Sequence, residues 1–300
     1  MMPDMYFTVT IDTEADHSKN WVKSDPLTFK SITEAIPGTL EPLFKKNGAS
    51  AAYLLTVEVL ENEAAVNTLK SLNDCELGTH LHPEYIAPEK KHTDYAGTYS
   101  KEFSNNYPLE VERKKIENIT RLFKEKIGRA PRAYRGGKFG FSDNTASILA
   151  DLDYAADTSV TPGISWQSIG GPDFRKMPSQ PYMIESAVSG KKLLEVPVSI
   201  VFLNGFSRIL NRPVWLRPSF NDALAMKKLV DAYLRIYSGK EKIVLNMMFH
   251  SMEFYPLASP YSAKLEDCRR LADRIDSIMR YCRDLGAKFC KLSDLREFYK

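Results

Sequence analysis

The chain has 300 residues, of which 43% are hydrophobic and 26% are charged, as is ordinary for a globular protein with a sizeable core. The net charge of +3 is too small and too evenly spread to indicate a nucleic-acid-binding protein. The four cysteines form no CxxC pair, which argues against a disulfide framework or a cysteine-type zinc site.

Apolar runs alternate with amphipathic segments along the chain. We expect strands at residues 5–11, 51–56, 76–80, 132–135, 154–156, 194–201, 243–249 and 288–291. Helices are expected at residues 31–46, 62–72, 109–126, 144–152, 221–237 and 265–285. The alternation predicts an α/β fold with a parallel sheet or barrel, in a single domain over residues 1–300, with long loops at residues 83–108 and 162–192.

Polar residues that can carry chemistry follow the predicted strands. Asp12, His80, Arg135 and His250 each lie at or just after the end of one. In a parallel barrel the C-terminal ends of the strands meet on one face, where active sites gather. We therefore expect these four side chains to lie close together.

Two histidines two residues apart, His80 and His82, should point to the same side of an extended segment. A carboxylate cluster, Asp12 and Glu14, follows the first strand and can meet them, and imidazole and carboxylate are ligands that Zn²⁺ binds well. The two histidines and a carboxylate of this cluster therefore predict a metal site. The alternative is that the histidines belong to an ordinary loop and that Asp12, Glu14 and Asp16 only cap the next segment. For Asp16, capping is the expected role.

Five segments, in this order, resemble the motifs of the polysaccharide deacetylase family, the NodB-homology group of carbohydrate esterases. They lie at residues 10–14, 76–83, 131–140, 157–162 and 249–253. Together the matches span roughly residues 5 to 295, which is nearly the whole chain. This resemblance implies a distorted (β/α) barrel with seven or eight mostly parallel strands.

The resemblance also implies a role for each matching residue. Asp12 matches the family's catalytic base, Arg135 the arginine that orients it, and His250 the general acid. One divalent ion, expected to be Zn²⁺, would be bound by Glu14, His80 and His82. The family's opening motif has two adjacent aspartates, whereas Thr13 separates Asp12 from Glu14 here. Which of the two is the base and which the ligand therefore stays open.

The implied activity is that of a metal-dependent hydrolase that removes an N-acetyl or N-formyl group from a sugar. The segment Gly136-Gly137-Lys138 resembles a sub-group linked to surface-glycan biosynthesis, so a surface-glycan or lipopolysaccharide precursor is the expected substrate. Lys138 would either contact a substrate phosphate or sugar carboxylate or be a solvated loop lysine. Two other interpretations stay open: a hydrolase of a small non-sugar amide, and a non-catalytic glycan-binding barrel.

Some loop residues are candidates for substrate contacts. Tyr85, Tyr95 and Trp166 either line a sugar cleft or pack against the barrel. Backbone N–H groups of residues 136–140 either bind an oxyanion or belong to a tight turn. No catalytic role is expected for His17 or His92.

The N-terminal residues lack the basic and apolar regions of a signal peptide, and no run approaches the roughly 18 apolar residues of a membrane span. With cysteines that have no evident pairing, this predicts a cytoplasmic protein. The expected partner is the acylamido sugar or saccharide substrate, with no nucleic acid and no membrane span. The sequence leaves the oligomeric state open.

Overall fold

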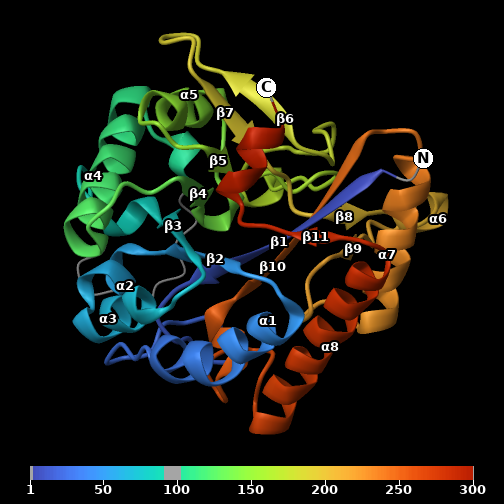
Figure 1. The fold of residues 1–300 in the computed structure, drawn as a ribbon. Helices are drawn as coiled ribbons and strands as arrows, with labels where there is room; N and C mark the ends of the chain where they lie inside the picture. The colour runs from blue at the N-terminus through green and yellow to red at the C-terminus, as the bar shows by residue number, and fades with distance from the viewer. Residues whose placement is uncertain (1–2, 91–102, 300) are drawn as a thin grey trace.

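The computed structural model describes residues 3–90 and 103–299 of the chain (Figure 1). Within these residues nine strands form one sheet: β1 (Asp4–Thr13), β2 (Ala51–Leu55), β3 (Glu76–Leu81), β4 (Ala133–Gly136), β5 (Ala156–Asp157), β6 (Tyr182–Glu185), β7 (Lys192–Glu195), β10 (Lys242–His250) and β11 (Lys288–Phe289). Eight of them follow the order β10-β1-β2-β3-β4-β5-β7-β6, and β11 pairs with β1. All pairs are parallel except β6 with β7. This curled sheet confirms the predicted distorted barrel.

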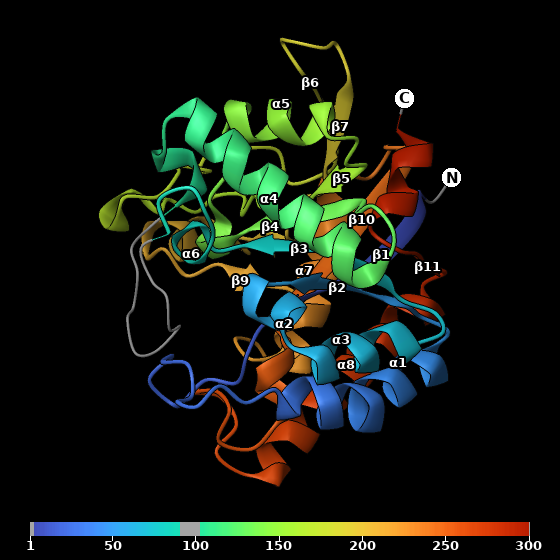
Figure 2. The ribbon, with the colours of Figure 1, turned by 90° about the vertical axis from the view of Figure 1, so that its left-hand side faces the viewer.

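Helices surround the sheet in Figures 1 and 2. They are α1 (Glu41–Asn47), α2 (Val57–Glu61), α3 (Glu63–Ser71), α4 (Leu109–Ile127), α5 (Asp143–Asp151), α6 (Gly205–Ile209), α7 (Ala223–Ile236) and α8 (Leu265–Asp284). A π-helical segment, η1 (Ser31–Leu40), leads into α1. Short 3₁₀ turns complete the fold: η2 (Pro83–Tyr85), η3 (Ser104–Asn106), η4 (Gly137–Phe139), η5 (Gln167–Ile169), η6 (Ser251–Phe254) and η7 (Ser293–Phe298). No helix in the described part of the chain is long and apolar enough to cross a membrane.

The interior of the curled sheet changes from apolar to polar along the strands. Near their N-terminal ends, Tyr6 and Val244 belong to a buried apolar cluster that Leu292 and Leu295 of the C-terminal segment join. Because every second residue of a strand faces the same way, later inward positions fall on polar residues, such as Thr10 on β1. The apolar end therefore contributes to the stability of the sheet, and the polar end carries the side chains that can take part in a reaction.

Asn246 of β10 joins one edge of the curled sheet to the segments that follow β5 and β7. Its backbone accepts a hydrogen bond from Ser199 N–H (3.1 Å) and donates one to Ser199 Oγ (2.8 Å). Its side-chain amide donates to Thr158 Oγ1 (2.7 Å) and to the backbone oxygen of Val196 (3.0 Å). These bonds connect β10 with the segment that follows β7.

Most predicted elements match the structure within two residues at each end, but two predictions are wrong and two helices, α2 and α6, were not predicted. The expected strand at 194–201 is divided into β7 and a short strand, β8 (Ile200–Val201), because Pro197 has no N–H for a sheet ladder. The expected loop at 162–192 contains β6. Helix α6, between β8 and its antiparallel partner β9 (Val214–Trp215), was not anticipated. The expected loop at 83–108 includes residues 91–102, which lie outside the described residues.

A buried pair of carboxyl groups joins β5 to β7. Asp157 and Glu195 are paired in the register, and both are fully buried. Ser159 donates its N–H and its hydroxyl to Asp157 (2.8 Å each), and Val160 N–H donates to Glu195 Oε1 (3.0 Å). Burial, together with the neighbouring Asp157, raises the pKa of Glu195 well above its ordinary value. Folding therefore favours the protonated form of Glu195 more strongly than the unfolded chain does.

Because the pKa of Glu195 is higher in the folded than in the unfolded protein, its proton stabilises the fold. This contribution is complete at pH values below the unfolded pKa and is lost as the pH rises toward the folded pKa. Glu195→Gln removes this dependence. Between the ordinary pKa of a glutamate and the raised pKa of Glu195, its free energy of unfolding should fall less steeply than that of the wild type, by up to about 1.4 kcal/mol per pH unit. Urea titrations followed by tryptophan fluorescence measure both slopes. The exposed Glu185→Gln on β6 is the control and should keep the wild-type slope; equal slopes for wild type and Glu195→Gln would contradict a raised pKa of Glu195.

Candidate active site

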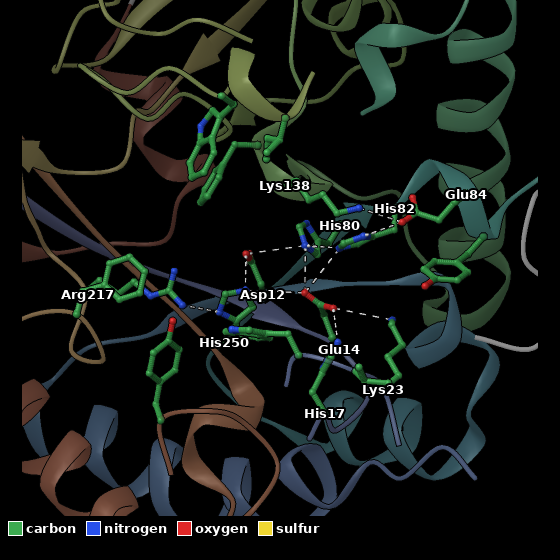
Figure 3. Close-up of a pocket in the computed structure, with 18 residues that line it drawn as sticks. Asp12, Glu14, His17, Lys23, His80, His82, Glu84, Lys138, Arg217 and His250 are labelled. Carbon is green, nitrogen blue, oxygen red and sulfur yellow. Dashed lines mark hydrogen bonds and ion pairs between the residues drawn. The ribbon is translucent and has the colours of Figure 1, made fainter. Parts of the chain in front are cut away.

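The C-terminal ends of four strands bring the predicted site residues together. Asp12 is paired with His250 in the register of β1 and β10, and His80 is paired with Arg135 in that of β3 and β4. Paired residues of parallel strands face the same side of the sheet. The structure therefore places all six predicted residues around one point, and all but Arg135 are labelled in Figure 3: Asp12, Glu14, His80, His82, Arg135 and His250.

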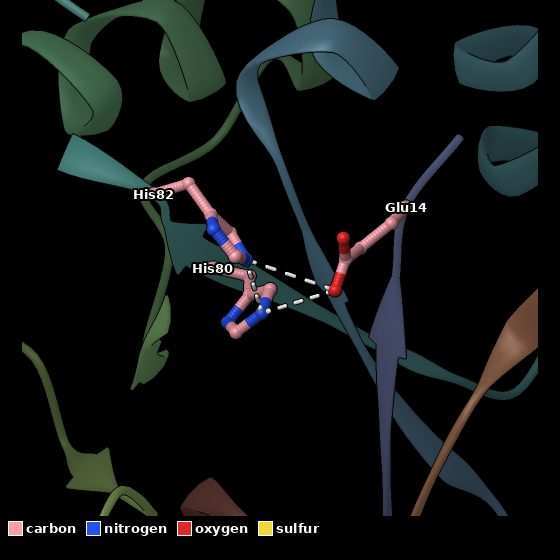
Figure 4. A group of neighbouring side chains, drawn as sticks. All are labelled: Glu14, His80 and His82. Carbon is pink, nitrogen blue, oxygen red and sulfur yellow. Dashed lines mark hydrogen bonds and ion pairs between the residues drawn. The ribbon is translucent and has the colours of Figure 1, made fainter. Parts of the chain in front are cut away.

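Glu14, His80 and His82 converge with one ligand atom each (Figure 4). Glu14 Oε1 lies 3.5 Å from His80 Nε2 and 3.7 Å from His82 Nε2. The two Nε2 atoms are 3.3 Å apart, and the rings are nearly perpendicular, at 87°. The two histidines therefore lie on the same side of β3, and the three donors surround a space suited to one divalent ion.

Both histidines of this trio are oriented through their second ring nitrogen. His80 Nδ1 lies 3.0 Å from the backbone oxygen of Arg135, so Nδ1 carries the proton and Nε2 offers its lone pair. His82 Nδ1 lies 3.7 Å from the carboxylate of Glu84. A carbonyl or carboxylate behind each imidazole is the usual arrangement around ligating histidines.

The electrostatics of the trio also fit a cation. Burial alone would raise the pKa of Glu14, but the facing His82 and His80 hold it well below its ordinary value. Burial alone would lower the pKa of His82, yet Glu14 and Glu84 raise it to about 9. This point of the molecule therefore stabilises positive charge, as a metal site must.

Asp12 is held by a fully buried ion pair. Arg135 Nη1 donates to Asp12 Oδ1 at 2.6 Å, and neither side chain reaches solvent appreciably. Burial would raise the pKa of Asp12, but Arg135, His80 and His250 lower it below the ordinary value. The other oxygen, Oδ2, faces His80 Nε2 at 3.9 Å and His250 Nε2 at 3.7 Å. Asp12 is thus an ionised carboxylate with one oxygen directed at the site.

His250 belongs to a second polar chain that the sequence analysis missed. Its Nδ1 lies 3.0 Å from Glu253 Oε1, and Arg217 Nη2 donates to the same oxygen at 2.7 Å. Glu253 is fully buried. Burial alone would raise its pKa, but Arg217 and His250 lower the pKa below the ordinary value. The sequence signal that could have revealed Glu253 is its position three residues after His250, because the 3₁₀ turn η6 brings residues at this spacing together. Nothing in the sequence placed Arg217 there.

These residues line a cavity of about 300 Å³ with a continuous wall of aromatic rings. Successive ring centroids lie 5.6 to 6.1 Å apart along Trp166, Phe139, Trp215, Phe220, Tyr261 and Trp21. Of the loop aromatics considered from the sequence, Tyr85 and Trp166 line the cavity. Tyr95 and His92 lie outside the described residues.

The glycines after Arg135 allow the backbone of this segment to approach the candidate metal ligands closely. A Cβ atom on Gly137 would lie 2.7 Å from the backbone oxygen of Leu81 and 3.0 Å from the ring of His82. The N–H groups of Gly136 and Gly140 donate to Ser159 Oγ and to the backbone oxygen of Gly137. These two N–H groups are therefore engaged inside the turn, which leaves them unsuited to the oxyanion contact considered above.

Three further residues can be compared with their expected roles. Asp16 accepts hydrogen bonds from the N–H groups of Lys30 and Ser31 at the start of η1, so the capping role is confirmed. His17, for which no role was expected, lines the cavity with Nε2 3.9 Å from Glu14, and burial lowers its pKa to about 4. Lys138 also lines the cavity, 3.2 Å from a carboxylate oxygen of Glu84.

No family model matches the sequence, and no curated protein matches it either. Solved structures do match, over nearly the whole chain. A proposed polysaccharide deacetylase from Mycobacterium smegmatis has 13% sequence identity and a TM-score of 0.58, covering 99% of this chain and 91% of that one. The fold is that of the polysaccharide deacetylases. The fold implied by the motifs is thereby confirmed.

Other proteins with the deacetylase fold differ in function. The Puue allantoinase matches with 13% identity and a TM-score of 0.58, covering 98% of this chain and 89% of that one. A CE4 family pseudoenzyme from Bacillus anthracis, in a mutant form with restored enzymatic activity, matches with 12% identity and a TM-score of 0.50, covering 100% of this chain and 70% of that one. At these identities the likeness establishes the fold, and the activity has to be argued from the residues.

Removal of one histidine should empty the candidate metal centre of this deacetylase fold. His80→Ala or His82→Ala leaves two ligands, so bound zinc should fall from about one ion per chain to almost none. Elemental analysis after zinc loading and gel filtration measures this ratio. Asp12→Asn is the control and should retain the ion. Loss of the ion from Asp12→Asn would make Asp12 a ligand and reverse the roles of Asp12 and Glu14.

Proposed function

We propose that this chain is a metal-dependent hydrolase that removes an N-acyl group, acetyl or formyl, from a sugar. One observation carries the proposal: an ionised aspartate and a carboxylate-supported histidine both face the three candidate ligands of a divalent ion. Asp12 Oδ2 and Glu14 Oε1 lie 3.7 and 3.9 Å from His250 Nε2. Amide hydrolysis needs a base, an acid and charge stabilisation at one carbonyl, and these residues can supply them.

In this proposal Asp12 is the base. A divalent ion bound by the trio, with Zn²⁺ the expected species, supplies a Lewis acid that lowers the pKa of water and polarises the acyl carbonyl. Asp12 Oδ2 accepts a proton from the attacking water, while the bond from Arg135 to Oδ1 fixes the carboxylate. Glu14 Oε1 faces both ligand histidines, which supports the ligand role for Glu14.

His250 is the general acid. The Glu253 carboxylate and the Arg217 guanidinium lie 3.0 and 3.2 Å from Nδ1 and orient the ring so that Nε2 faces Asp12. As water adds to the carbonyl carbon and the C–N bond breaks, Nε2 donates its proton to the leaving nitrogen. The products are a carboxylic acid and an amino sugar. Glu253 acts through His250 and is therefore a positioning residue.

The proposed substrate is a surface-glycan or lipopolysaccharide precursor in the cytoplasm. A cavity of about 300 Å³ is at the small end of the range for ligand sites and suits one acylated sugar residue, with aromatic faces available for the ring. All four cysteines lie in the described part of the chain and are unpaired there, as a reducing compartment requires.

A second candidate is a hydrolase of a small non-sugar amide. Two observations favour it: an allantoinase has the same fold, and the cavity is small. It uses the same trio, base and acid. A non-catalytic glycan-binding barrel has less support, because Asp12, Arg135 and His250 are not only present but in mutual contact through Asp12.

Loss of the acid or of its support should lower turnover and leave the metal centre intact. His250→Ala should lower kcat by about 10²- to 10⁴-fold, the usual contribution of a general acid. Glu253→Gln should lower kcat by a smaller factor, because the amide oxygen can still accept a hydrogen bond from the ring and orient it but no longer carries a charge. Steady-state kinetics with elemental analysis test both. Glu266→Gln, an exposed carboxylate on α8, is the matched control; a Glu253→Gln enzyme with unchanged kcat would remove Glu253 from the mechanism.

The zinc-loaded protein should release acetate or formate from a soluble or lipid-linked acylamido sugar. Mass spectrometry with a panel of nucleotide sugars, lipid-linked sugars, insoluble polymers and small cyclic amides identifies the substrate. Deacetylation of chitin or peptidoglycan without action on precursors would overturn the precursor assignment. Turnover of a cyclic amide alone would establish the second candidate.

A further inference from the structure

Exposed apolar side chains gather at the end of the barrel where the candidate site lies. Among the described residues, nine of the twelve large apolar side chains that are exposed lie on segments that follow β3, β8, β9 or β10: Leu109, Leu203, Phe206, Ile209, Leu210, Phe220, Leu224, Leu257 and Leu265. Of the other three, Val188 and Ile236 precede β7 and β10, and Phe298 stacks on Tyr6 near the start of β1. Four of these exposed side chains, Leu203, Phe206, Ile209 and Leu210, lie within eight consecutive residues of the chain.

The most exposed part of this surface is a short helix that needs no partner to form. We call Leu203, Phe206, Ile209 and Leu210 the α6 patch. Phe206 and Ile209 are 69% and 81% exposed. Asn204 caps the helix by accepting a hydrogen bond from Ser207 N–H (2.8 Å), and Ser207 Oγ–H donates back to the Asn204 backbone oxygen (2.7 Å). The helix therefore holds its apolar side chains in solvent without help from another molecule.

The α6 patch adjoins the cavity. In Figure 2, α6 lies on the side of the molecule to which β3 points, and this is the side of the candidate site. Phe202, directly before the patch, packs closely on Gly163. A Cβ atom added to Gly163 would lie 2.7 Å from the ring of Phe202. Trp166, three residues beyond Gly163, lines the cavity. A surface that covered the patch would therefore lie beside the cavity.

The charge of this region is one-sided. Residues 196–221 contain three arginines and no acidic residue. Arg208 and Arg212 are exposed beside the patch, and the Arg208 guanidinium carbon lies 5.1 Å from the ring of Phe202. Exposed Phe, Leu and Ile side chains with arginines between them match the boundary of a membrane, where acyl chains lie beneath anionic headgroups.

We propose that the α6 patch docks on a lipid bilayer that carries anionic headgroups. The apolar side chains enter the acyl region, and Arg208 and Arg212 contact the headgroups. A protein partner would need a contact of about 800 Å² on each side, far more than one helical turn offers. If the proposed function also holds, docking places the cavity beside the bilayer, and the substrate class is a lipid-linked acylamido sugar.

Vesicle flotation of the full chain tests this docking. The wild type should bind phosphatidylcholine vesicles that contain about one third phosphatidylglycerol, and bind less at high salt and on pure phosphatidylcholine. The double variant Phe206→Ser/Ile209→Ser should partition at least about tenfold less. Val188→Ser/Ile236→Ser removes exposed apolar side chains from the segments before β7 and β10 and should bind like the wild type. Circular dichroism checks that both variants are folded.

Several outcomes would overturn the proposal: no binding to either vesicle, equal binding by both double variants, or a dimer that only the α6 variant dissociates in light scattering. The last would make the patch an interface between two copies. Turnover of a water-soluble acylamido sugar separates this test from the proposed function. It should be the same in wild type and α6 variant, and inactivity of both proteins on this sugar and on the lipid-linked sugars of the panel would contradict the proposed function while leaving the vesicle result valid.

Discussion

The buried guanidinium of Arg135 is the interaction on which the candidate site depends. Its side chain donates to Asp12 Oδ1 (2.6 Å), to Thr10 Oγ1 (2.6 Å) and to the backbone oxygen of Thr158 (2.9 Å). A charge with no solvent exposure is tolerated only with partners of this quality. Its own backbone oxygen accepts from His80 Nδ1. One residue of β4 thus orients the proposed base through its side chain and a candidate ligand through its main chain.

The same polar layer also holds the barrel together. Asn246 accepts a hydrogen bond from Thr10 and donates one to Thr158, and both hydroxyls also accept hydrogen bonds from Arg135. Nearer the cavity, other cations are matched by buried carboxylates: Lys23 with Glu58, Lys138 with Glu84, and Arg217 with Glu253. Because Glu84 contacts Lys138, the positive charge considered for a substrate phosphate is already partly neutralised, which favours an uncharged acylamido group at the site itself.

Much of the fold and site follows from local patterns in the sequence, but contacts between distant segments do not. Apolar runs locate the parallel strands, and period-two spacing puts His80 and His82 on one side. Spacing alone could not reveal Arg217, which reaches Glu253 across 36 positions. Strand β6 was missed because its residues are only partly buried and show no clear alternation. The roles of Asp12 and Glu14 depend on which carboxylate Arg135 contacts, and only three-dimensional structure contains that information.

The wall of the cavity shows where this molecule departs from relaxed backbone geometry. Trp21, Lys138 and Phe139 all line the cavity, and all have left-handed φ values of 59°, 54° and 64°. For such residues this conformation costs on the order of 1 kcal/mol or more, which packed surroundings must offset. Phe139 is secured by stacking on Trp166, and Trp21 by contacts with His17, Tyr261 and His250. The relaxed, apolar end of the barrel supplies stability, and this stability offsets the strain of the aromatic and cationic side chains held around the three candidate metal ligands.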